Sequence, residues 1–163
     1  MGILQCITSL FDSLPEKPQK EKRSNPNRNF HDHNKLLRAF FDGDAQNNSC
    51  GCGIHIIMNE NTQYLISWNG GKGSNCKAEA MALAGLLSFC IFLNIQSVSI
   101  FRDSKVIVDY VLGKIHISNP HLVGWMNRIE FLWRRMERCS IQRIYRVQNK
   151  KVDILSKERV SGT

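Results

Sequence analysis

The chain has 163 residues, of which 42% are hydrophobic and 22% are charged, and its formal net charge is +8. This length suits one domain with a buried core, and the excess of Lys and Arg favours a polyanion such as nucleic acid over an acidic or neutral partner. No apolar run of membrane-spanning length and no secretory leader is apparent, so we expect neither a membrane protein nor a secreted one.

The six cysteines are spread along apolar and helical segments. Zinc sites usually take CxxC or CxxH spacing. The pair Cys50-x-Cys52, with His31-x-His33 upstream, is an alternative ligand set, but loop thiols and a polar tail are the simpler interpretation. Thiols that are not needed for disulfides predict an intracellular location, in the nucleus or the cytoplasm.

Residues 1–34 predict a flexible basic tail, because they are rich in Pro, Asn and Lys and contain few residues to bury. A solvated linker is the simpler interpretation of this tail, and a tether to nucleic acid is the alternative. The folded domain is predicted over residues 35–163, where regular hydrophobic patterns begin.

The first half of this domain predicts three strands and a helix. The runs LLRAFFDG, GCGIHIIMN and QYLISWN are of β type and are joined by turn formers, which indicates an antiparallel meander. We expect the first run to stop at Asp42-Gly43. A glycine-rich connection leads to a helix over residues 76–93, with one buried apolar stripe and with Ser74 or Asn75 as its cap.

The second half predicts parallel strands joined through helices. SVSIF is a strand that leads to Arg102-Asp103, KVIVDYV is a short helix that ends at Gly113, and residues 121–138 form a longer helix. SIQRIYRV is a last strand and NKKVDILSKER a terminal helix. This order predicts an α/β fold with a mixed five-stranded sheet, three antiparallel strands followed by parallel strands, flanked by helices.

Four acids stand at the ends of predicted elements: Asp42, Glu79, Asp103 and Asp153. Each has a structural explanation of its own, as a strand stop, a helix cap or a partner of a helix dipole. As a set they predict a shared pocket. Like charges in one pocket need a cation to offset them, and divalent metal ions are the natural candidates.

The segments FFDGD (40–44), KAEAMALAGLL (77–87), IFRDSKVIVDYVLG (100–113) and IYRVQNKKVDILSK (144–157) together resemble the ribonuclease H (type 1-like) domain. The resemblance is to the reverse-transcriptase-like group of plant proteins and retroelements. It implies a ribonuclease H-like fold and a metal-dependent endonuclease that hydrolyses the RNA strand of RNA–DNA hybrids by a two-metal-ion mechanism.

The resemblance also implies roles for single residues. Asp42, Glu79, Asp103 and Asp153 are the expected catalytic residues and the ligands of two Mg²⁺ ions, for which Mn²⁺ can substitute. The expected substrate-binding residues are Gly43, Ser74, Asn75, Arg146 and Asn149. We expect a monomer whose partner is the hybrid, held in part by the Arg and Lys side chains of residues 128–151.

Three positions depart from the family pattern: Arg102 before the third acid, Arg143 in place of a mobile histidine, and Val147 in place of a glutamate. An arginine beside the site either holds phosphate or weakens metal binding through its positive charge. These departures leave an alternative function open, a catalytically weak or inactive retroelement-derived domain that binds nucleic acid. We expect Asp44, a further acid near the site, to point away from the pocket.

Overall fold

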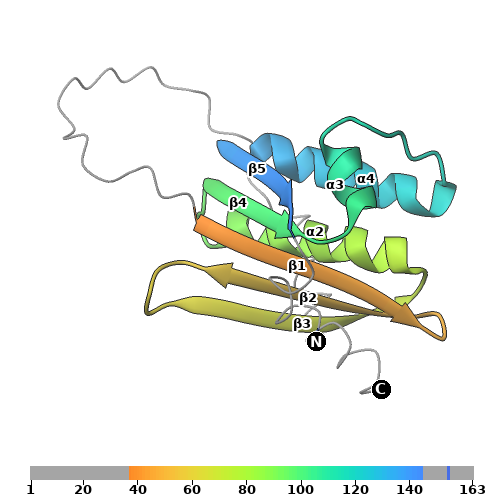
Figure 1. The fold of residues 1–163 in the computed structure, drawn as a ribbon, viewed down its shortest axis with the longest axis horizontal. Helices are drawn as coiled ribbons and strands as arrows, with labels where there is room; N and C mark the ends of the chain where they lie inside the picture. The colour runs from red at the N-terminus through yellow and green to blue at the C-terminus, as the bar shows by residue number, and fades with distance from the viewer. Residues whose placement is uncertain (1–36, 145–153, 155–163) are drawn as a thin grey trace.

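The computed structural model describes residues 37–144 and residue 154, and the proposed tail and the terminal helix with Asp153 fall outside this part. Figure 1 shows one sheet with helices packed on it. The elements in chain order are β1 (Leu37–Gln46), β2 (Ser49–Ile57), β3 (Gln63–Lys72), α2 (Asn75–Phe92), β4 (Ser97–Arg102), α3 (Lys105–Val111), α4 (Pro120–Arg135) and β5 (Arg138–Arg143).

The five strands form one mixed sheet in the order β3-β2-β1-β4-β5. β1 pairs antiparallel with β2, and β2 pairs antiparallel with β3. β4 runs parallel to β1, and β5 runs parallel to β4. The predicted fold class is therefore confirmed, and the two parallel strands β1 and β4 lie side by side at the centre of the sheet.

The predicted end of the first strand at Asp42-Gly43 is wrong. β1 continues to Gln46, and Asp42 and Gly43 pair with Gly53 and Cys52 of β2. Pairing along the whole length of β2 overrides the weak strand preference of Asp and Gly. The chain reverses instead at Asn47 and Asn48, whose φ angles of 50° and 62° are left-handed values that asparagine tolerates and a two-residue hairpin requires.

Helix α2 is the centre of the core. It contacts β1, β2 and α4, so it lies between the sheet and the outer helix (Figure 1). Its buried residues occupy nearly every side of the helix and not the single stripe that the sequence predicts. Many of them are alanines, including Ala78, Ala80, Ala82 and Ala84, whose small side chains allow neighbours to approach on both sides.

A further expectation concerns membrane-spanning segments. By length and mean hydropathy, 1.3 over 18 residues, α2 is apolar enough to cross a membrane, so the expectation that no such run exists is wrong. Its 61% burial is typical of a core helix.

The five cysteines among the residues described are free. Burial raises the pKa of Cys90 to about 12, so its thiol stays protonated at neutral pH.

Candidate carboxylate site and the adjacent basic pocket

Three of the predicted acids come together where β1, β4 and α2 meet. Asp42 lies in β1 and Asp103 directly follows β4. Phe40 pairs with Phe101 in the parallel register of these strands, which places the two aspartates at the same edge of the sheet. Glu79 reaches this edge from the early part of α2.

Gly43 sets the distance between the strand and the helix. A Cβ atom at this position would lie 2.1 Å from the carbonyl carbon of Ala78 and 2.3 Å from the backbone nitrogen of Glu79. Any side chain larger than hydrogen would collide with helix backbone, which cannot rotate away. Glycine therefore allows β1 and α2 to touch, and this contact brings Asp42 beside Glu79.

The guanidinium group of Arg102 lies among the three acids. Its Nη2 atom is 2.6 Å from Oδ1 of Asp42 and 2.8 Å from Oε1 of Glu79. Its Nη1 atom forms an ion pair with Oδ1 of Asp103. The group also lies over the ring of Phe41, with its Cζ atom 5.8 Å from the ring centroid.

This cluster is largely shielded from water. The exposed fraction of the side chain is 6% for Arg102, 4% for Asp42, 12% for Glu79 and 13% for Asp103. A buried guanidinium is tolerated only when oppositely charged partners offset its lost hydration. Arg102 and the three carboxylates are therefore interdependent, because the guanidinium needs the acids and each acid needs the guanidinium.

The alternation along β4 is a sequence signal for this role of Arg102. In β4 every second residue is buried, namely Val98, Ile100 and Arg102. A charged residue at the last buried position of such a strand needs buried partners of opposite charge. The partners that Arg102 contacts are three acids of the recognised motifs, Asp42, Glu79 and Asp103.

Two neighbouring residues complete the surroundings. The Nε atom of Arg143 in β5 donates a hydrogen bond to the backbone carbonyl of Asp103 at 3.2 Å. Asp44 is two residues after Asp42 in one strand, and side chains two apart share a face, so the alternation of the strand does not turn Asp44 away from the pocket. Its Oδ2 atom accepts a hydrogen bond from Gln46 at 3.3 Å.

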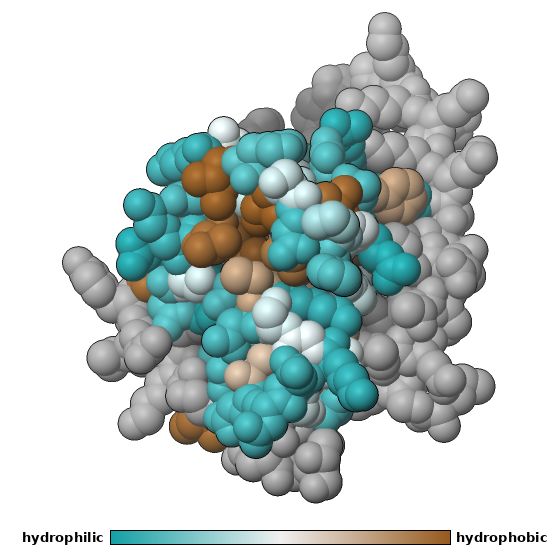
Figure 2. Space-filling view, turned by 90° about the vertical axis from the view of Figure 1, so that its right-hand side faces the viewer, coloured by the Kyte–Doolittle hydropathy of each residue, from teal (hydrophilic) through white to brown (hydrophobic). Residues whose placement is uncertain are grey.

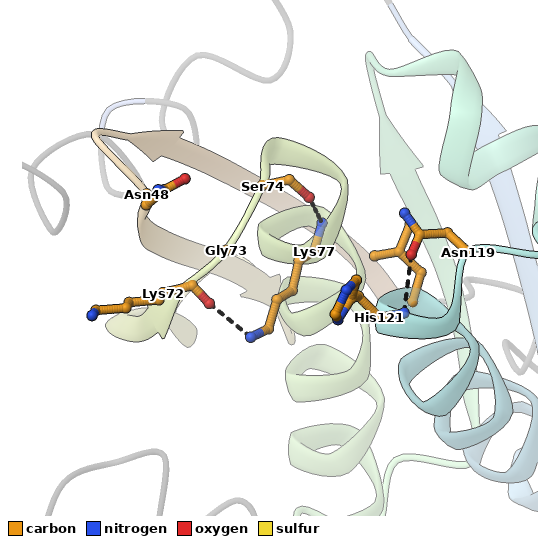
Figure 3. A pocket seen from close by; sticks show the side chains of 8 residues that line it. Asn48, Lys72, Gly73, Ser74, Lys77, Asn119 and His121 are labelled. Carbon is orange, nitrogen blue, oxygen red and sulfur yellow. Dashed lines mark hydrogen bonds between the residues drawn. The ribbon is translucent and has the colours of Figure 1, made fainter.

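A basic pocket lies at the amino ends of α2 and α4 (Figure 3). Its volume is about 370 Å³. Lys77 donates from Nζ to the carbonyl of Lys72 at 2.7 Å, and its backbone nitrogen donates to Oγ of Ser74 at 3.3 Å. The lining residues are Asn48, Lys72, Gly73, Ser74, Lys77, Asn119, His121 and Leu122.

This end of the molecule is mostly hydrophilic. Figure 2 faces it and shows polar residues over most of the described surface, with a group of apolar side chains among them. Backbone N–H groups at a helix start attract anions, and two helices of more than three turns begin at the pocket. With two lysines beside them, the pocket is suited to an anionic group.

The predicted substrate-binding residues have different positions. Ser74 caps α2 and lines the pocket. Oδ1 of Asn75 accepts a hydrogen bond from the backbone of Ala45 at 2.6 Å, so this side chain ties α2 to β1. Gly43 forms the strand–helix contact. Arg146 and Asn149 fall outside the described part of the chain, as does Asp153.

The three acids agree in kind with a site for a divalent metal ion, because carboxylate oxygens are the ligands that Mg²⁺ prefers. Within residues 37–144 no three Asp, Glu, His or Cys side chains are placed to bind a single metal ion. The guanidinium of Arg102 takes the place of the cation on which these oxygens converge.

Residues 40–159 match the protein family described as reverse transcriptase-like. The chain belongs to the reverse transcriptase-like family. No curated protein matches the sequence of this chain.

Solved structures with the same architecture include ribonucleases H. RNase H1 from the halophilic archaeon Halobacterium salinarum superposes with a TM-score of 0.74 at 20% identity, covering 79% of this chain and 100% of the other. The N-terminal RNase H domain of a Mycobacterium tuberculosis protein gives 0.73 at 20% identity, covering 78% and 100%. LC11-RNase H1 in complex with an RNA/DNA hybrid gives 0.69 at 22% identity, covering 77% and 97%. The reverse transcriptase-like chain therefore has a ribonuclease H-like fold.

Proposed function

We propose that this protein is a ribonuclease H-type enzyme that hydrolyses the RNA strand of RNA–DNA hybrids. The observation that carries the proposal is the convergence of three acids, Asp42, Glu79 and Asp103, in a ribonuclease H-like fold. Their oxygens meet at one buried cationic group, the guanidinium of Arg102. A structure of the same fold, LC11-RNase H1, is a complex with an RNA/DNA hybrid, which supports this choice of substrate.

In this proposal the three acids, with Asp153, would hold two Mg²⁺ ions. When bound, such ions supply an activated water and stabilise the leaving oxygen of the scissile phosphate. The chain's own contribution is to keep the carboxylates together. The glycine contact at Gly43 holds Asp42 against α2, and the β1–β4 pairing holds Asp103 next to it.

The basic pocket would bind a backbone phosphate of the nucleic acid. Phosphate groups bind well where lysines and the N–H groups of a helix start meet, as they do around Ser74 and Lys77. Lys77 and Glu79 are two residues apart in one helix, so their side chains leave it about 200° apart and the bound phosphate would lie on another face of α2 than the acids. The pocket would thereby anchor the nucleic acid on the protein.

The proposal is tested with labelled RNA–DNA hybrid, single-stranded RNA and duplex RNA, each with EDTA, Mg²⁺ or Mn²⁺. We expect cleavage of the RNA strand of the hybrid alone, with 5′-phosphate and 3′-hydroxyl ends, only when metal is present. Asp103→Asn should lower the rate by about a hundredfold or more, since it removes a negative charge from the site, while hybrid binding persists.

Glu137→Gln is the matched control, because it removes an exposed acid just before β5, at the end of the parallel strands away from the carboxylates. It should cleave like the parent. Cleavage by the Asp103→Asn protein at the parental rate would show that the activity belongs to a contaminant or that the proposal is wrong.

One observation favours a second function, a domain that binds hybrid without cleaving it. Arg102 contacts all three acids at once, and its positive charge opposes the entry of metal ions. Hybrid binding by the purified protein, with no cleavage over a wide range of Mg²⁺ and Mn²⁺ concentrations, would select this function.

A further inference from the structure

We propose that Arg102 is the resident counter-ion of the carboxylate site and that divalent metal ions bind only by displacing its guanidinium group. The inference concerns the same site as the proposed function, but it is about cation binding and does not depend on hydrolysis.

The guanidinium of Arg102 occupies the position that a metal ion between the acids would take. A metal ion held by Asp42 and Glu79 would coordinate their oxygens at roughly 2.0–2.1 Å for Mg²⁺. In the structure Nη2 of Arg102 lies between the two residues, 2.6 Å and 2.8 Å from one oxygen of each. An ion and this nitrogen cannot share the same pair of oxygens. The third acid, Asp103, is engaged by Nη1 of the same group.

The positive charge of the guanidinium also opposes metal binding. A guanidinium carries its positive charge at any relevant pH, so it cannot lose a proton to admit a metal ion. A guanidinium and a metal ion that are both shielded from water repel each other strongly. The site is therefore expected to have two alternative states, one with arginine among the acids and one with metal ions among them.

Metal ions can nevertheless displace the guanidinium. Arg102 offsets only one of the three negative charges, whereas divalent ions offset more. Its Nε atom has no hydrogen-bond acceptor within the residues that the structure describes, so the buried group is incompletely satisfied. Metal ions at sufficient concentration can therefore compete, but the displaced arginine weakens their apparent affinity.

The experiment compares the metal response of the parent, Arg102→Met and Arg138→Met without nucleic acid. Thermal unfolding is followed in EDTA and in Mg²⁺, and Mn²⁺ binding is measured by calorimetry. Methionine keeps much of the length of arginine but removes the charge. Arg138 is an exposed arginine at the opposite end of the parallel strands, paired with Ser97, and provides the control.

In EDTA, Arg102→Met should unfold at a lower temperature than the parent, because three carboxylates are left close together without a cation. Mg²⁺ should restore much of this loss and should raise the unfolding temperature of this variant more than that of the parent. Mn²⁺ should bind Arg102→Met about tenfold more tightly or better, since a positive charge in contact with the acids is gone. Arg138→Met should respond to metal like the parent.

A variant that is destabilised equally with and without metal would overturn the proposal, because a purely structural arginine gives that result. Equal Mn²⁺ affinity of the parent and Arg102→Met would overturn it as well. If Arg102→Met does not fold, Arg102→Lys takes its place. Lysine offers one nitrogen instead of two, so Mn²⁺ should bind this variant more tightly than the parent, and equal affinities contradict the inference.

The two proposals can fail separately. Tighter metal binding by Arg102→Met, with no cleavage of hybrid by any variant, would leave the counter-ion role intact and reject the ribonuclease. Metal-dependent cleavage by the parent, with no change in metal affinity on removing Arg102, would support the ribonuclease and reject the counter-ion role.

Discussion

Gly43 is the residue on which the spacing of the acids depends, and alanine at this position should be harmful. Its methyl group would lie 2.1 Å from the backbone of Ala78, so β1 and α2 would have to separate. We expect Gly43→Ala to lower the free energy of unfolding by about 1–3 kcal/mol, as other overpacking substitutions do. Urea unfolding measures this loss.

Gly124 provides the comparison. It lies inside α4, and a Cβ atom there would meet nothing within 4 Å. Gly124→Ala should leave stability unchanged or raise it by up to about 1 kcal/mol, because alanine favours the helix. A Gly43→Ala protein as stable as the parent would mean that the strand and the helix are not held together as described.

Single residues differed in how far the sequence could place them. Asp42, Glu79 and Asp103 were predictable as a group because each lies in a recognisable motif and the motifs occur in a known order. The contacts of Arg102 were not predicted. They depend on which face of β4 is buried and on how closely α2 approaches β1, and these are properties of the packed structure.

At the scale of the elements, the hairpin between β1 and β2 fixes how far β1 extends beyond Asp42. Asn48 has a φ of 62°. Asn48→Ala should lower the free energy of unfolding by about 1 kcal/mol, because residues with a Cβ atom disfavour this conformation, whereas Asn48→Gly should not. Both variants lose the asparagine side chain, so the difference between their chemical unfolding midpoints isolates the backbone effect. Equal midpoints would argue against a left-handed turn.

The order and type of the elements in residues 37–144 followed from their hydrophobic patterns, but some boundaries did not. β1 was predicted too short because Asp and Gly weakly disfavour strands, and only the partner strand β2 shows that pairing continues. α2 was predicted with one buried stripe because a periodicity rule cannot show that α4 covers its other side.

For the whole molecule, the net charge of +8 and the basic pocket predict binding to hybrid that depends strongly on salt. If about four phosphates are neutralised, affinity should fall roughly a hundredfold between 50 and 200 mM monovalent salt. Lys72→Met should reduce the slope of log K against log salt by about one, and Lys72→Arg should preserve it. Fluorescence anisotropy in EDTA measures both. A slope that Lys72→Met leaves unchanged would exclude this pocket from the interface.

The parallel pairing of β1 with β4 also has a consequence for the order in which the molecule forms. Phe40 meets Phe101 across a long intervening stretch of chain, so this pairing is among the slower events expected in folding. The carboxylate site cannot form before Asp103 has been synthesised and β4 has paired with β1. A cation bound there would therefore act mainly by slowing the opening of the finished domain and would do little to accelerate its formation.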